Sequence, residues 1–299
     1  MILTVCLSST LQKTVTFDKV LLTHVNRSKT YRLDASGKAV NTARVLNQLE
    51  KGCVTSLCPL GKENAALFLE LAERDGLSVK SIMIPGFTRE CLTLLDYSSN
   101  ETTELVVGEP VLDFDRDSAQ NDFMNLLSSS LTDDCKAVVL AGSRPAVWSD
   151  DFQARLCKLS VDAGCILLAD FCGKDLIKTL EICIPQIIKI NEEEFCSTFG
   201  FSFPMKEEDL RDEICKKSSE WKNIIVITRG TDKTFASRNG EFFSCSIEKV
   251  TPINTTACGD SFNAGFIYEF LKSGDMQKSL QKGTWCAARN AQSEVPGAI

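Results

Sequence analysis

Short apolar runs alternate with longer amphipathic segments along most of the sequence, and this alternation constrains the fold more than any other feature. Short apolar runs are typical of buried strands, and apolar residues spaced three or four apart are typical of helices. The expected strands are residues 1–8, 54–57, 137–141, 165–170, 186–190 and 224–228. The expected helices are residues 38–51, 64–74, 151–163, 174–181, 192–199, 207–217, 261–272 and 277–293. This order predicts an α/β fold with a mostly parallel sheet covered by helices on both faces.

Two stretches interrupt this order with strand-like segments. Residues 15–32 contain short alternating segments, and residues 92–107 have the pattern of a hairpin that turns at residues 98–100. We therefore expect a small sheet, built from about residues 12–33 and 88–108, that covers the ligand-binding end of the main sheet. Neither an internal repeat nor a low-complexity linker is visible, so residues 1–299 are predicted to form one domain with these lid insertions.

The charge balance argues against a nucleic-acid partner. The chain has 33 basic and 40 acidic residues, a net charge of −7, whereas proteins that bind a phosphate backbone need clustered positive charge. The apolar runs are too short to span a bilayer, and the start has no basic leader or cleavage site. We expect a cytoplasmic protein without a membrane partner.

The fourteen cysteines do not have the spacing of a metal site. No Cys-x-x-Cys pair occurs, and the single histidine, His24, leaves too few ligands for a zinc set. Most cysteines have apolar neighbours, so we expect reduced thiols packed in the core. One histidine and no G-x-S-x-G motif also argue against Ser-His-Asp chemistry.

Residues 254–265 place a run of small residues directly before an amphipathic helix. The first N–H groups of a helix have no helical acceptor and bind anions such as a phosphoryl group. Asp260 stands at this point. Because a carboxylate repels phosphate, we expect Asp260 to accept a proton from an attacking hydroxyl. A simple helix cap is the alternative explanation for this residue.

The same segment resembles the signature of the ribokinase-like (PfkB) sugar kinases, usually Asp-Thr-Thr-Gly-Ala-Gly-Asp-Ser-Phe. Residues 34–46 are similar to the family's N-terminal Gly-Gly-Lys-Gly-x-Asn-x-Ala box, and three further matches, at 141–145, 189–194 and 228–230, follow in the same order. The resemblance covers nearly the whole chain. It implies a three-layer α/β/α fold with a small β-sheet lid, ATP and Mg²⁺ as cofactors, and a lid sheet that pairs between two subunits.

The resemblance also implies roles for the matched residues. The phosphoryl group is expected at the backbone of Ala257, Cys258 and Gly259, with Asp260 as the catalytic base. The sugar is expected at Gln12, Gly37, Lys38, Asn41 and Ser143. The nucleotide is expected at Lys189, Asn191, Thr228, Arg229, Gly230, Thr231, Asp232, Lys233, Gly259 and Asn290. Magnesium is expected at Asn191 and Glu194, since oxygen ligands suit this ion.

Two arginines indicate the substrate class. Arg27 and Arg89 match positions where the phosphosugar branch of the family, 1-phosphofructokinase and tagatose-6-phosphate kinase, binds the phosphate that the substrate already carries. Arginine can donate two parallel hydrogen bonds to such a group. The resemblance therefore implies a kinase that converts a phosphorylated ketohexose, fructose 1-phosphate or tagatose 6-phosphate, into a bisphosphate.

Several residues depart from the family pattern. The departures are Gln12 for an aspartate, Ser36, Ala39 and Lys233 for glycines, and Ala257 and Cys258 for Gly-Ala. A side chain at position 257 is expected to crowd the phosphate or to forbid a positive φ. These departures leave two alternatives open: a sensor that binds sugar phosphate or nucleotide with little turnover, and a kinase for a non-phosphorylated sugar or a nucleoside.

Overall fold

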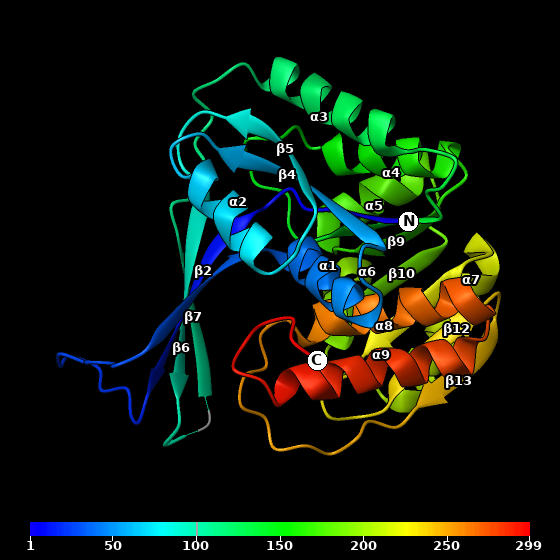
Figure 1. Cartoon of the computed structure of the whole chain (residues 1–299). Coiled ribbons are helices and arrows are strands. Elements are labelled where there is room, and N and C mark those ends of the chain that lie inside the picture. The colour runs from blue at the N-terminus through cyan, green and yellow to red at the C-terminus, as the bar shows by residue number, and fades with distance from the viewer. Residues whose placement is uncertain (100) are drawn as a thin grey trace.

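The computed structural model describes residues 1–99 and 101–299, which form a layered α/β/α body with a small sheet beside it (Figure 1). The strands are β1 (Ile2–Val5), β2 (Thr10–Phe17), β3 (Tyr31–Ser36), β4 (Val54–Gly61), β5 (Val79–Ile84), β6 (Arg89–Asp96), β7 (Glu101–Val107), β8 (Ala137–Ala141), β9 (Ile166–Asp170), β10 (Ile187–Asn191), β11 (Ile224–Thr228), β12 (Thr234–Arg238) and β13 (Glu241–Cys245). The helices are α1 (Lys38–Leu49), α2 (Ala65–Arg74), α3 (Arg116–Ser130), α4 (Phe152–Asp162), α5 (Gly173–Ile182), α6 (Glu192–Phe199), α7 (Glu207–Trp221), α8 (Cys258–Ser273) and α9 (Met276–Ala291). The predicted fold class is confirmed.

The main sheet has the order β13-β12-β11-β10-β9-β8-β1-β4-β5. Its strands pair in parallel from β11 to β5, and β12 and β13 extend it as an antiparallel edge. Central strands such as β1 and β8 are buried along their whole length, which agrees with their almost entirely apolar sequences. The carboxyl ends of the parallel strands therefore meet at one edge of the sheet.

Two hydrophobic cores fill the space between the layers. Both cores contain residues of the main sheet; helices α1, α2, α8 and α9 pack on it in one core, and helices α3 to α7 pack on it in the other. Burial on both faces of the sheet is what the predicted order of strands and helices requires. Along residues 1–99 and 101–299, no helix is long and apolar enough to cross a bilayer.

The small sheet has the order β3-β2-β6-β7 and lies beside the body (Figure 1). We call this small sheet the lid. The expected hairpin is present as the antiparallel pair β6–β7, although Asn100 of its predicted turn lies outside the described residues. The prediction of strand-like segments throughout 15–32 is wrong for residues 18–30, which form the loop between β2 and β3. The first strand ends at Val5 instead of residue 8, because the chain there leaves the main sheet for the lid.

Four elements were not predicted. Helix α3 has few apolar residues and many serines and asparagines, which are weak helix formers, but Asp115 caps its start and Phe123 is buried. Strand β5 and the two strands of the β12–β13 hairpin were not predicted either. The hairpin does carry a signal, since Asn239-Gly240 forms its turn and both residues have positive φ.

Candidate active site

The small residues before α8 form an open helix start. The first helical bond in this turn runs from Ser261 N to Ala257 O (2.8 Å), so the amides of Gly259 and Asp260 precede it and have no helical acceptor. Ala257 has a φ of 66°, in the left-handed region. The expectation that a side chain at 257 forbids a positive φ is therefore wrong: the alanine adopts the left-handed conformation despite its steric cost.

Asp260 lies in the first turn of α8 and is 5% exposed. Its Oδ2 accepts a hydrogen bond from Asn41 Nδ2 in α1 at 2.9 Å. Burial raises the pKa of Asp260 to about 6, and Asp170 adds to this rise, while Lys38, Asn41 and Lys189 oppose it. A carboxylate with such a pKa is ionised at neutral pH and can still take up a proton, as a general base must.

A charged cluster surrounds Asp170, a residue that the sequence analysis missed. Asp170 ends β9, is 1% exposed, and accepts a hydrogen bond from Asn263 Nδ2 at 2.7 Å. Its other oxygen lies 3.7 Å from Lys189 Nζ and 3.8 Å from Lys38 Nζ. Burial works to raise the pKa of Asp170, but the two lysines outweigh it and the pKa is lowered. The signal in the sequence was an acid at the carboxyl end of an apolar strand, where α/β proteins bind ligands.

The two lysines face the open helix start. A Cβ at Gly259 would lie 3.0 Å from Lys189 Nζ, so the missing side chain is what lets this ammonium approach the turn. Lys38 also lies 3.9 Å from Glu194 Oε1, and Asp170 is the main cause of its raised pKa. The ammonium of Lys189 thus lies beside the two free amides, and Lys38 interacts electrostatically with Asp260, so the turn suits an anion.

The predicted sugar residues form a hydrogen-bonded chain across the lid and α1. Gln12 Nε2 donates to Thr93 at 2.7 Å, and Gln12 Oε1 accepts from Ser36 Oγ at 2.7 Å. Ser36 Oγ also lies 2.9 Å from Asn41 Oδ1, and Asn41 continues to Asp260. Gln12 and Asn41 are each 4% exposed, so both are held within the protein.

Gly37 joins the lid to α1. Its φ is 120°, and a Cβ there would lie 2.7 Å from Cys6 Sγ and 3.0 Å from Ser8 O, so this position needs glycine. Ser143, also predicted at the sugar, is exposed after β8.

The two predicted phosphate-binding arginines lie at opposite ends of the lid. Arg89 pairs with Thr10 at the end of the lid that joins the body, whereas Arg27 lies in the loop beyond Phe17. Strand β2, whose eight residues span about 23 Å, runs between these two ends of the lid. Arg89 Nε donates to Thr10 Oγ1 at 2.8 Å, and its Nη1 lies 2.5 Å from Glu109. Within one chain the structure therefore does not bring Arg27 and Arg89 together.

The predicted nucleotide and magnesium residues meet at the edge where β10 and β11 end, since Asn191 and Thr228 are neighbours in register. Asn191 and Glu194 form a capping box: Asn191 Oδ1 accepts from Glu194 N and Glu194 Oε2 accepts from Asn191 N, both at 2.8 Å. Glu194 Oε1 is not used in this box, so it is the oxygen of the pair that can hold a hydrated cation.

Other predicted nucleotide residues are arranged in two ways. Residues 230–233 are exposed in the loop between β11 and β12. Arg229 of the same loop donates to Glu192 (2.8 Å) and Glu207 (2.9 Å), so its side chain joins this loop to α6 and α7. Asn290 is buried in α9 and donates to Thr256 O at 2.8 Å, which braces the turn before α8.

A family model of pfkB carbohydrate kinases matches residues 1–298. The chain belongs to the pfkB family of carbohydrate kinases. Solved structures agree with this pfkB fold at low sequence identity. Phosphofructokinase-2 from Escherichia coli, in complex with potassium, matches with a TM-score of 0.87 at 16% identity, over 99% of this chain and 94% of that chain. A possible 1-phosphofructokinase from Thermotoga maritima matches with a TM-score of 0.85 at 18% identity, over 99% and 93%. A nucleoside kinase from Burkholderia thailandensis, in complex with inosine, matches with a TM-score of 0.72 at 18% identity, over 99% and 92%.

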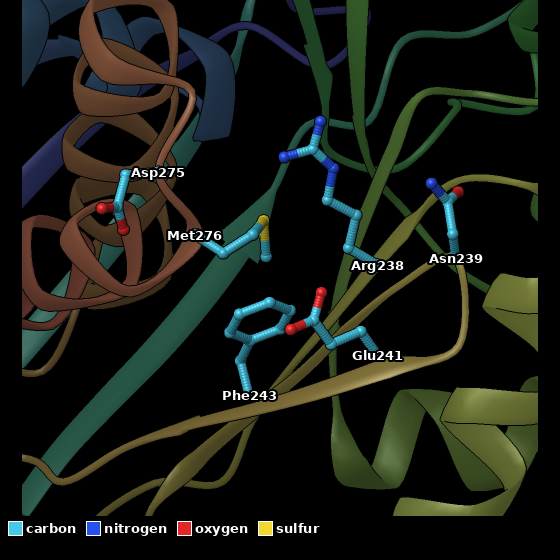
Figure 2. Close-up of a pocket in the computed structure, with 6 residues that line it drawn as sticks. All are labelled: Arg238, Asn239, Glu241, Phe243, Asp275 and Met276. Atoms are coloured by element: carbon cyan, nitrogen blue, oxygen red, sulfur yellow. The ribbon is translucent and has the colours of Figure 1, made fainter.

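The pfkB chain also has a hollow of about 600 Å³ away from this site (Figure 2). Asp275 and Met276 line it from the helical side, and the remaining lining residues belong to the β12–β13 hairpin. Because Arg238 pairs with Ile224 at the start of β11, the hollow lies at the opposite edge of the sheet from Asp260. The charged cluster, not this hollow, has the chemistry of a phosphoryl-transfer site.

Proposed function

We propose that this pfkB-family chain is an ATP-dependent kinase that transfers the γ-phosphoryl group to a hydroxyl of a phosphorylated ketohexose, fructose 1-phosphate or tagatose 6-phosphate. One observation carries the proposal: the buried carboxylate of Asp260 stands beside the free amides of the turn before α8. A base for the hydroxyl and donors for the phosphoryl oxygens are the two parts that such a transfer requires.

In the proposed reaction, the hydroxyl oxygen attacks the γ-phosphorus while the bond to the bridging oxygen of ADP breaks. The hydroxyl proton passes to Asp260, which is ionised above its pKa of about 6. The amides of Gly259 and Asp260 and the ammonium groups of Lys38 and Lys189 stabilise the negative charge on the transferring group. Asp170 holds the two lysines in place.

Magnesium is proposed at the end of β10, where Glu194 Oε1 takes no part in the capping box and lies 3.9 Å from Lys38 Nζ. Bound there through water, with Asn191 holding the glutamate in place, the ion would neutralise charge on the nucleotide phosphates. Residues 228–233 and Lys189 would bind the nucleotide from the adjoining strand end.

The phosphorylated acceptor is supported by Arg89. Its guanidinium is paired with Glu109, whose side chain is 52% exposed, so an incoming phosphate dianion would compete with a solvated carboxylate. A second candidate is a kinase for a non-phosphorylated sugar or a nucleoside. It is favoured by the distance between Arg27 and Arg89 and by Gln12, which lacks the charge of an aspartate.

The proposal also includes a homodimer formed through the lid. Strand β7 is an edge strand, and Leu105, Val106 and Val107 are 47%, 48% and 50% exposed. An apolar edge strand with unpaired N–H and C=O groups can pair with a second copy of itself.

ADP release from ATP and Mg²⁺, measured over a panel of phosphorylated and free sugars and nucleosides, tests the function. We expect turnover with a ketohexose phosphate, and we expect Asp260→Asn to lower kcat by about a hundredfold or more while the substrate still binds. Glu269→Gln, a carboxylate change further along α8, is the matched control and should leave kcat unchanged.

Three outcomes would contradict this assignment. Turnover restricted to free sugars or nucleosides would support the second candidate. Binding without ADP release from any compound would indicate a sensor. Wild-type kcat in Asp260→Asn would remove the proposed base.

A further inference from the structure

Arg44, in α1, is a buried arginine whose five N–H groups all have acceptors. Nη1 donates to Asn41 Oδ1 at 3.0 Å and to the carbonyl of Pro296 at 3.1 Å. Nη2 donates to the carbonyl of Ala35 at 2.5 Å and to Asp75 Oδ2 at 3.2 Å, and Nε donates to the same Asp75 oxygen at 3.3 Å. Because all five N–H groups are hydrogen-bonded, the guanidinium is held in one orientation, and it can in turn orient the groups that accept its hydrogen bonds.

One of those groups is the amide of Asn41, which lies between Arg44 and Asp260. A guanidinium donates hydrogen bonds and accepts none, so the amide oxygen must face Arg44. The amide nitrogen then faces Asp260 Oδ2, at 2.9 Å. Ser36 Oγ lies 2.9 Å from the same amide oxygen, but it lies closer, at 2.7 Å, to Gln12 Oε1, and its single hydroxyl hydrogen can be donated fully to only one of them. Arg44 is therefore the donor that holds the amide.

The direction of this amide matters for the proposed base. An N–H donor stabilises an ionised carboxylate, whereas an amide oxygen in the same place would favour the protonated acid. The other charged or titratable groups around Asp260 come from neighbouring elements: Lys38 of α1, Asp170 of β9, Lys189 of β10, Cys6 after β1, and Cys258 of α8. Among the described residues, Asn41 supplies the side-chain hydrogen bond to the carboxylate of Asp260.

We propose that Arg44 is a positioning residue for phosphoryl transfer: it holds the oxygen of Asn41 so that the amide N–H is kept on Asp260. Arg44 itself touches neither substrate nor reacting atoms. The kinetic part of this inference rests on the proposed function, but the orientation of the amide does not. The same guanidinium contacts the carbonyl of Ala35 in β3 and that of Pro296, so it ties the lid and the C-terminal segment to the base.

The test compares Arg44→Gln with Arg44→Lys. A glutamine can accept as well as donate, so it no longer forces the amide of Asn41 to one side, whereas a lysine still only donates. The carboxyl carbon resonance of Asp260, assigned by its absence in Asp260→Asn, is titrated by NMR. We expect Arg44→Gln to raise the pKa of Asp260 by about one to two units and Arg44→Lys to leave it near the wild-type value.

Asp75→Asn is the matched control, because it disturbs the same buried cluster and leaves the bond from Arg44 to Asn41 in place. An equal rise of the pKa in Asp75→Asn, or no rise in Arg44→Gln, would overturn the proposal. If Arg44→Gln does not fold, Ser36→Ala is the deciding variant. A raised pKa of Asp260 in Ser36→Ala would show that Ser36, and not Arg44, orients the amide of Asn41, whereas an unchanged pKa supports Arg44.

The kinetic readout separates this proposal from the proposed function. In an active kinase, the acid limb of kcat/KM should move to higher pH in Arg44→Gln by the same amount as the pKa of Asp260. If the wild-type protein transfers no phosphoryl group, the proposed function fails, and the NMR titration still shows whether Arg44 positions Asn41.

Discussion

Asp260 combines burial with two nearby lysines, and burial dominates, so the pKa of its carboxyl is raised to about 6. A general base works only in its ionised form. We therefore expect kcat/KM to be constant above about pH 7 and to fall about tenfold per pH unit below about pH 6. Initial rates measured between about pH 4.5 and 8.5 check this expectation. The residual activity of Asp260→Asn should lack this limb, and a wild-type limb near pH 4 would show that burial does not control the base.

Short motifs drew attention to some residues of the candidate site, but the sequence could not show which partner a side chain would take. Asp260 and Lys38 were identified from short motifs, and the structure brings them to one cluster. Asp170 was missed because a single acid at the end of a strand forms no motif with its sequence neighbours. Its partners, Lys38 of α1 and Lys189 of β10, come close only in the folded chain. Arg229 was assigned to the nucleotide, but Glu192 lies within its reach, a pairing that the sequence could not disclose.

Helix α8 begins after a strained residue, and this gives a prediction on stability. Ala257 has a φ of 66°, which costs an alanine about 1 kcal/mol relative to glycine. Ala257→Gly should therefore raise the free energy of unfolding by about 1 kcal/mol, measured by denaturant titration. The same substitution at Ala287, inside α9, should lower it by about 1 kcal/mol, because glycine is a poor helix residue. A loss of stability in Ala257→Gly would contradict the proposed strain.

The strands and helices were predictable where periodicity was strong. The βα units around the site follow from apolar runs and amphipathic helices, which tertiary packing then buries in the expected way. Helix α3 could not be predicted because one cap and a few buried side chains such as Phe123 compensate for a sequence of weak helix formers. The pairing of β2 with β6, more than seventy residues later in the chain, depends on contacts that no local pattern contains.

At the scale of the whole molecule, β7 at the outer edge of the lid ends in three exposed apolar residues, and this gives a prediction on assembly. We expect the wild-type protein to sediment as a dimer and Val106→Lys to sediment as a monomer, because a charge on β7 opposes pairing between copies. Met83→Lys places the same charge on β5, the exposed edge of the main sheet, and should leave the dimer intact. A wild-type protein that is monomeric at every concentration tested would reject the lid as the dimer interface.

The lid is joined to the body by very short connections, of which residues 6–9 link β1 to β2 and Gly37 alone links β3 to α1. Because these connections are short, any rotation of the lid relative to the body would take place about the start of α1. Lys38 and Asn41 lie within one helical turn of that pivot. In the proposed kinase, a rotation of the lid about this link would therefore shift Gln12 and Ser36, which the lid carries, relative to Lys38 and Asn41 of α1.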